Sequence, residues 1–354
     1  MSAVNRREFA MPRLIARLLI GLAAAFVLGG GAAAKPLVVL LADARGTVAP
    51  DLLAPYAILA ESGAVEVKVV SATMRPVRLT PGKAWVSPQM TLAQLARERP
   101  GGPDVVIVPA LEVVDDPARS AWLRAQVRGG ARIMSICNGA KVLAAAGLLD
   151  GRRATVHWHS RAKLARQYPK VIWRRDLRWV ADGPITTTAG ISAVEPASLD
   201  LLRRLAGESV MRETARRLAL PVPDQRHRGE DYHLTVRGAG LVVANRLAFW
   251  GHEDVAVPLA QGLDELAFGA AMDAWSRTYR STAWAVGAPR VTSRHGLRIY
   301  RDLTLPARFD RTIALPGGEP MQTTFTQIHR AYGAPTARFV ALQFEHPYGA
   351  ISPR

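Results

Sequence analysis

Short apolar runs alternate with segments of helical composition along the first half of the chain. Four runs are predicted to be buried strands: Leu37–Ala42, Val65–Ser71, Asp104–Pro109 and Ile133–Ile136. Helices are predicted between them at Pro50–Ser62, Met90–Arg97 and Pro117–Val127, and a hairpin or extended excursion at Arg75–Val86. Apolar strands that alternate with helices are typical of a parallel sheet covered on both faces, so the pattern predicts an α/β fold.

The segment Ala131–Asp150 holds the main candidate for chemistry. A predicted strand leads into the only cysteine of the chain, Cys137, and an Ala/Leu-rich helical stretch follows. A nucleophile at a sharp turn between strand and helix is the geometry of a nucleophile elbow. The start of a helix favours a thiolate, and the backbone N–H groups of Asn138 and Gly139 are candidates to stabilise an oxyanion. The alternative is that Cys137 is a buried structural thiol.

Three linked segments then suggest a family. The runs SICNGAKVLAAAGLLDGRRATVHW, YPKVIW and DGPITTTAGISA, in this order, resemble the DJ-1/PfpI superfamily over roughly residues 36–218. The resemblance is closest to the class I glutamine-amidotransferase-like domains of isonitrile hydratases and of the front part of AraC-type regulators. It implies a flavodoxin-like three-layer sandwich with a mostly parallel sheet, in which ATVHW is a strand and the elbow cysteine is the reactive group.

The resemblance also implies which side chains accompany Cys137. Asp51 matches the acidic residue that family members place beside the thiol, where in isonitrile hydratases the acid handles the proton while sulfur attacks carbon. The alternative for Asp51 is a helix N-terminal residue favoured by the dipole. His157 matches a family histidine near the site, and its alternative is a satisfied core histidine. The segment Ile191–Pro196 reads ISAVEP where the family has ISAGID, so the pocket shape is expected to differ.

Two function classes follow. The first is a cysteine-dependent hydratase or hydrolase that acts on a small electrophilic substrate, with catalytic Cys137, Asp51 and His157 and with no cofactor. The second is a non-catalytic ligand-sensing or regulatory domain that keeps the elbow without using it. Asn138 stands where proteases of the superfamily have histidine, so a local Cys–His pair is not supplied. The sequence leaves open whether Cys137 is used.

The last hundred residues are predicted to be a truncated second copy. The stretch from Val255 repeats the order strand, helix, strand and hairpin found from Val38, and DRTIALP stands against DVVIVP. The copy is predicted to end in a strand at Arg338–Phe344, without a cysteine, so it cannot carry elbow chemistry. The predicted domains are a DJ-1/PfpI-like domain at 35–219, a linker at 220–250 and the second copy at 251–354.

The amino terminus reads as an export signal. Residues 1–34 have a basic start, an apolar segment and small residues before Lys35, and Arg6-Arg7 followed by Phe9 resembles a twin-arginine signal. Cleavage after Ala34 predicts a periplasmic or secreted protein. The alternative is an uncleaved membrane anchor, which would be the protein's only membrane contact.

The charge distribution and the remaining motifs indicate which kinds of partner to expect. The formal net charge is +17, but the basic residues are scattered singly or in pairs, so no nucleic-acid partner is expected. His227, Glu230 and His233 meet no recognised metal-ligand spacing and are expected to be solvated loop residues, so no metal site is predicted. A small-molecule substrate or ligand is the expected partner, and a homodimer is the default because dimers are common in the superfamily.

Overall fold

The predicted apolar strands pair into one large sheet. The computed structural model describes residues 34–315 and 317–349. The sheet has seven strands in the order β11-β12-β8-β7-β1-β3-β6, and all neighbours pair in parallel except β11 with β12. The strands are β1 (Leu37–Leu41), β3 (Glu66–Ser71), β6 (Met90–Thr91), β7 (Val105–Val108), β8 (Arg132–Ser135), β11 (Trp179–Asp182) and β12 (Ile185–Thr188).

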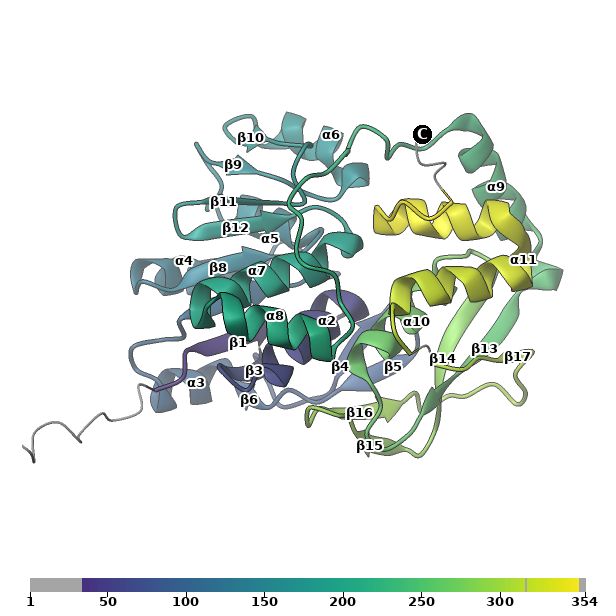
Figure 1. The fold of residues 1–354 in the computed structure, drawn as a ribbon, viewed down its shortest axis with the longest axis horizontal. Helices are drawn as coiled ribbons and strands as arrows, with labels where there is room; N and C mark the ends of the chain where they lie inside the picture. The colour runs from purple at the N-terminus through teal and green to yellow at the C-terminus, as the bar shows by residue number, and fades with distance from the viewer. Residues whose placement is uncertain (1–33, 316, 350–354) are drawn as a thin grey trace, which may run out of the picture. The chain divides into compact units, whose positions relative to one another are not determined.

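Helices cover both faces of this sheet (Figure 1). Side chains alternate along β1, so that Val38 and Leu40 belong to one apolar core while Leu37, Val39 and Leu41 belong to the other. The first core is closed by α2 (Ala49–Glu61), α7 (Val194–Ala206) and α8 (Glu208–Arg217). The second is closed by α3 (Leu92–Glu98), α4 (Pro117–Arg128), α5 (Gly139–Ala145) and α6 (Trp158–Gln167). The three-layer, flavodoxin-like α/β prediction is confirmed.

One predicted strand of this domain is wrong. ATVHW is a strand only in its first residue, because β9 (Arg153–Ala154) ends there and pairs with the short β10 (Ile172–Trp173). His157 then becomes the N-cap of α6, with its side chain accepting a hydrogen bond from the N–H of His159 at 3.4 Å. The resemblance implies a strand through Trp158, but the side-chain cap at His157 favours a helix start there.

The carboxy-terminal part builds a second, smaller sheet. Strands β14 (Ser281–Gly287), β13 (Glu253–Leu259) and β17 (Arg311–Thr312) pair in parallel, and α10 (Glu265–Ser276) connects β13 to β14. The order β17-β13-β14 matches the order β7-β1-β3 of the main sheet. Before this sheet come α9 (Val236–Leu247) and the 3-10 turn η2 (Phe249–Gly251), within the predicted linker.

A five-stranded sheet joins the two parts. Its order is β15-β16-β5-β4-β2, and β5 and β16 pair antiparallel at its middle. Thus each part contributes one hairpin, and the prediction of a hairpin within Arg75–Val86 is confirmed. The strands are β2 (Thr47–Val48), β4 (Val77–Thr80), β5 (Ala84–Val86), β15 (Arg290–Thr292) and β16 (Arg298–Arg301).

The two parts contact each other in a reciprocal way. The backbone of α10 packs closely on α2, where a Cβ atom at Gly269 would lie 3.3 Å from the Cα of Pro50. The β4–β5 turn approaches α10, since a Cβ at Gly82 would lie 2.6 Å from the Met272 methyl group. In return, the carbonyl of His295 in the β15–β16 turn accepts a hydrogen bond from the α2 hydroxyl of Tyr56 at 2.9 Å. Pro36 onward forms one compact unit.

The predicted strand Arg338–Phe344 is wrong, because this segment is helical. It forms the second half of α11 (Pro320–Phe344), which is kinked at Gly333, where φ is +81°. Ala337, Val340, Ala341 and Phe344 are buried at helical spacing. A short apolar run does not distinguish a buried strand from one face of a helix. The predicted export signal at 1–34 lies, apart from Ala34, outside the described residues.

Candidate active site around Cys137

Cys137 occupies a strained turn between β8 and α5. Its φ is +51°, a left-handed conformation that residues other than glycine rarely adopt. The Cys137 N–H donates a hydrogen bond to Thr188 Oγ1 at 3.0 Å, which ties the turn to the end of β12. Gly139 is required behind it, because a Cβ atom there would lie 2.1 Å from the Val108 carbonyl oxygen. The elbow predicted from the sequence is therefore present, and strain of this kind is often stored at functional sites.

The thiol of Cys137 is enclosed and held neutral. The residue is only 4% exposed. Burial raises its pKa well above the ordinary value, and the negative charges of Asp51 and Glu345 add to this rise. The Arg277 guanidinium and the Asn138 N–H act in the opposite direction. At neutral pH the sulfur carries its proton, so an attack by sulfur requires a partner that takes this proton.

Asp51 is a buried acid beside this thiol. It lies in the first turn of α2 and is fully buried. One carboxylate oxygen, Oδ2, accepts a hydrogen bond from the Ala110 N–H at 3.0 Å, while Oδ1 has no hydrogen-bond partner among the described residues. Burial raises the pKa of Asp51 to about 7, and the nearby charge of Asp273 contributes. A carboxyl group with this pKa can both donate and accept a proton near neutrality.

An ion pair from the carboxy-terminal part also acts on the charges of the Cys137 site. Asp273 lies on α10, and Arg277 lies one turn later at the end of this helix. Arg277 Nη2 donates a hydrogen bond to Asp273 Oδ1 at 3.1 Å. Asp273 is fully buried, and Arg277 acts on the charges of both Cys137 and Asp51. Sequence reasoning missed this pair, because it lies more than 130 positions from the elbow in the chain and no motif marks it.

His157, by contrast, is occupied by structural contacts. Its Nε2 bonds the carbonyl oxygen of Gln343 at 2.9 Å, and Nδ1 accepts the N–H of His159. Burial lowers its pKa to about 4, so the ring is neutral at physiological pH. Of the two predicted oxyanion donors, the N–H of Asn138 faces the sulfur, whereas that of Gly139 donates to the Ile136 carbonyl at 2.7 Å.

Glu345, just past the end of α11, is a buried carboxylate whose charge acts on Cys137. Its backbone is left-handed (φ +56°), and its carboxylate accepts the Trp158 N–H at 2.6 Å and bonds His227 Nε2 at 2.6 Å. Although burial alone would raise it, the pKa of Glu345 lies below its ordinary value because of the hydrogen bond with His227. Gly190 makes room for this side chain, since a Cβ there would lie 2.7 Å from Glu345 Cγ.

The partnership of Glu345 corrects one prediction. His227 is not a solvated loop residue, because it is 8% exposed and bonded to Glu345, whereas Glu230 and His233 are exposed as expected. No group of histidine, cysteine or carboxylate side chains within 34–315 and 317–349 could hold a metal ion. In the same part of the chain, we find no helix with the length and apolar character needed to cross a membrane.

Comparisons with known proteins identify a family for the first part of the chain. The model of the DJ-1/PfpI family matches residues 37–204. Isonitrile hydratase of Pseudomonas putida is 32% identical over 163 residues, which cover 44% of this chain and 67% of that enzyme. The HTH-type transcriptional regulator CdhR of Pseudomonas aeruginosa is 38% identical over 104 residues, 29% of this chain and 31% of the regulator. The chain thus matches about a third of that regulator's length.

Among solved structures, Drosophila melanogaster DJ-1beta aligns with 53% of this chain and 99% of its own, at 22% identity and a TM-score of 0.48.

Proposed function

Since this chain belongs to the DJ-1/PfpI family through residues 37–204, we propose that it is a cysteine-dependent hydratase or hydrolase for a small electrophile. Cys137 is the nucleophile and Asp51 the acid and base. The observation that carries the proposal is the fully buried carboxyl group of Asp51. It has a pKa of about 7 and lies near the Cys137 thiol, which keeps its own proton. Such a pair suits an uncharged substrate with an electrophilic carbon, because neither the thiol nor the protonated Asp51 carboxyl carries a charge before the reaction.

The chemistry is simplest to write for a carbon–nitrogen multiple bond, as in an isonitrile. Asp51 donates its proton to the substrate carbon while the Cys137 sulfur forms a bond to the same carbon, and the Asp51 carboxylate takes the thiol proton. The product is a thioimidate, R–N=CH–S–Cys137. Water then adds to that carbon, the carbon–sulfur bond breaks, and R–NH–CHO leaves as the thiol is restored. Water is the only co-reactant, and the Asn138 N–H and the Arg277 charge stabilise negative charge near sulfur.

Two observations bear on the proposed reaction, one on the size of the substrate and one on the role of His157. Cys137 is 4% exposed, so the proposed substrate is a small molecule. His157 has no role as a base in this scheme, because both ring nitrogens are bonded and its pKa is about 4. It positions the end of α11 instead.

The test uses the full chain and four variants. Aliphatic isonitriles, nitriles and amides are offered in turn, and product formation is followed by chromatography. We expect Cys137→Ser to abolish turnover and Asp51→Asn to lower kcat by about 10² to 10⁴, as for loss of a general acid. Asp182→Asn, an exposed carboxylate paired with Arg153, serves as the matched control and keeps full activity. His157→Gln changes stability more than kcat. Turnover that survives Cys137→Ser would refute the proposal.

A second candidate is a ligand-sensing protein without catalysis. The specific observation in its favour is the burial of Cys137, which is only 4% exposed. The nearby Glu345 is also buried, and it is bonded to Trp158, His227 and, through its carbonyl, Ser192. Alkylation of Cys137 against pH distinguishes the two. A thiol that reacts slowly at every pH, with a rate indifferent to Asp51→Asn, would favour sensing over catalysis.

Two further proposals concern the two ends of the chain. The carboxy-terminal part, 251–354, is proposed to be a truncated second copy, and the shared strand order and the reciprocal hairpin–helix contacts support this. This part packs on α2 through α10. Export through residues 1–34 to the periplasm is proposed from the sequence pattern.

A further inference from the structure

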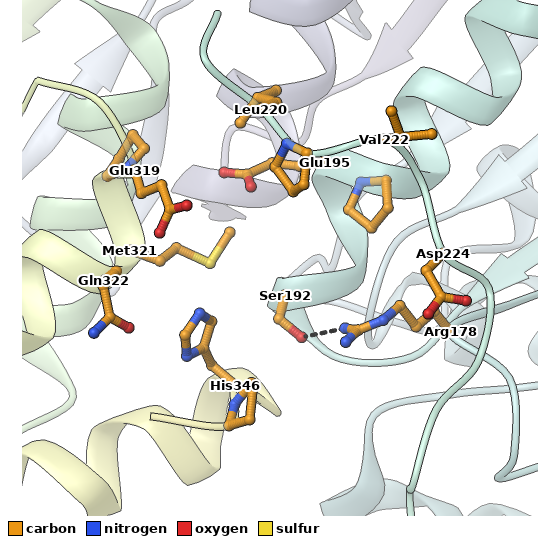
Figure 2. A pocket seen from close by; sticks show the side chains of 14 residues that line it. Arg178, Ser192, Glu195, Leu220, Val222, Asp224, Glu319, Met321, Gln322 and His346 are labelled. Carbon is orange, nitrogen blue, oxygen red and sulfur yellow. Dashed lines mark hydrogen bonds between the residues drawn. The ribbon is translucent and has the colours of Figure 1, made fainter. Parts of the chain in front are cut away.

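A pocket of about 250 Å³ lies apart from Cys137, where the main domain meets the start of α11 (Figure 2). Its walls are mostly apolar. They come from the first turn of α7, from the segment that follows α8 and from both ends of α11, and they include Leu220, Val222, Met321 and several prolines. A concave site with apolar walls and a few polar groups is the usual form of a small-molecule site.

Two carboxylates face this pocket without partners. Glu195 belongs to the Val194–Pro196 segment that departs from the family pattern, and Glu319 precedes α11. Figure 2 shows both carboxylates directed into the space between the two parts of the chain. Neither side chain makes a hydrogen bond or ion pair with any residue within 34–315 and 317–349.

A third acceptor lines the same pocket. The Nδ1 atom of His346 is shielded from solvent and has no hydrogen-bond partner among the described residues. Burial lowers the pKa of His346 to about 4, so the ring is neutral and one nitrogen can accept a hydrogen bond. An edge contact with Phe325, with ring centroids 5.1 Å apart, helps to hold the ring in place.

The donor at the other end of the pocket is already engaged. Arg178 donates to Ser192 Oγ at 3.3 Å and lies near enough to Asp224 to lower the pKa of that carboxyl, behind the effects of Arg226. The side with Glu195, Glu319 and His346 therefore presents acceptors that lack donors. These three do not form a group that could hold a metal ion. Acceptors of this kind are complementary to a cation that carries several N–H donors.

We propose that this pocket, hereafter the acidic pocket, binds a small primary ammonium compound, with its –NH₃⁺ group between Glu195 and Glu319 and its carbon chain on the apolar wall. An ammonium has three donors and no acceptor, which matches two carboxylates and a neutral imidazole nitrogen. The site is separate from Cys137 and does not depend on the proposed hydration chemistry.

The ionisation of Glu195 provides an independent readout. Burial raises its pKa to about 7, and the negative charges of Glu319 and Asp264 contribute. The other charged or titratable groups on the pocket are Arg178, Asp224 and His346. A bound cation favours ionised Glu195, so binding releases a proton near pH 7 and tightens between pH 6 and pH 8.

The experiment is a ligand-observed NMR titration of the full chain with n-butylammonium at pH 6 and pH 8. Butyltrimethylammonium (no N–H donor), n-butanol and butyrate are the control ligands. We expect n-butylammonium to bind more tightly at pH 8, and Glu195→Gln or Glu319→Gln to weaken it at least about tenfold, as for a lost charge-assisted hydrogen bond. Glu208→Gln, an exposed carboxylate paired with Arg212, is the matched control and leaves binding unchanged.

Any of the following results would contradict the proposal. Equal binding of butyltrimethylammonium would show that N–H donors are not recognised. Preference for butyrate would show that Arg178 rather than the carboxylates selects the ligand. Binding indifferent to both glutamine variants, or none at all, would also overturn it. The Cys137→Ser variant must bind as the wild type does, so failure here is distinguishable from failure of the hydratase proposal. Melting curves verify that the glutamine variants remain folded.

Discussion

Replacing Asp51 by asparagine tests whether the buried acid is neutral near physiological pH. Its ordinary pKa is 3.8 and burial raises it to about 7 in the folded chain. A raised carboxyl pKa means that folding disfavours the ionised form. Stability is therefore unaffected by this group below pH 3.8, falls as the pH rises from 3.8 to 7, and is constant above that range. At about 1.4 kcal/mol per pKa unit, the cost above pH 7 is about 4 kcal/mol.

Asparagine removes this cost while it keeps an oxygen that can accept the Ala110 N–H. We expect the free energy of unfolding of Asp51→Asn, minus that of the wild type, to be about 3 kcal/mol larger at pH 8 than at pH 5. Urea titrations monitored by tryptophan fluorescence at both pH values measure this difference. The greater part of the change falls between pH 5 and pH 7.

The control is Asp182→Asn, since hydrogen bonds from Arg153 lower the pKa of that exposed carboxyl and no titration falls between pH 5 and pH 8. The free energy of unfolding of Asp182→Asn, minus that of the wild type, should therefore stay constant between pH 5 and pH 8. If the difference for Asp51→Asn were equally flat, Asp51 would be ionised throughout. The general-acid role would then be lost together with the electrostatic argument for the site.

Three other predictions concern the turn, the contact between the two parts and export. Gly139→Ala places a Cβ 2.1 Å from the Val108 carbonyl oxygen and should cost at least about 3 kcal/mol in a urea titration, whereas Gly240→Ala, in open space on α9, should not destabilise. Burial alone would lower the pKa of His295, but its pairing with Glu265 and Glu61 raises it above 6.5. Glu61→Gln should therefore cost about 1 to 3 kcal/mol near pH 6 and less near pH 9, as the imidazolium is lost. Replacing Arg6 and Arg7 by lysine should leave the precursor in the cytoplasm, and amino-terminal sequencing of exported wild-type protein should begin at Lys35.

Local signals explain why the main domain could be predicted. The strands around Val38 and Val106 are buried on both faces, so each is a continuous apolar run. Asp116 and Pro117 mark the start of α4, and the Asp116 side chain does accept the Arg119 N–H at 3.0 Å. The elbow was predictable for the same reason, since strand, cysteine and helix are consecutive.

The rest of the site depends on contacts between distant parts of the chain. Glu345 reaches Trp158 across 187 positions and His227 across 118. A left-handed glutamate after a helix leaves no pattern in the sequence, because its backbone conformation is imposed by the partners that bind it. His227 was assigned to solvent for this reason, since its neighbours along the chain are polar and its buried partner is remote.

The differences between the two parts suggest why a fused copy would replace a second subunit. In a two-fold pair of identical chains every contact occurs twice. Here α2 and α10 each carry a fully buried acid in the first turn, Asp51 and Glu265, but in different states. Asp51 keeps an oxygen without a partner and a pKa of about 7, whereas Glu265, despite its burial, has a lowered pKa because His295 bonds it.

Identical subunits could not hold these two states at equivalent positions. The proposed fused, diverged copy could, because each part has its own sequence. The carboxy-terminal half has no elbow cysteine, and α10 is free to direct Asp273 and Arg277 at the Cys137 site of the first half. The reciprocal packing of hairpins on helices brings the two parts together, and the proposed chemistry is concentrated in the first. The proposed duplication thus accounts for an ion pair that no motif of the elbow domain predicts.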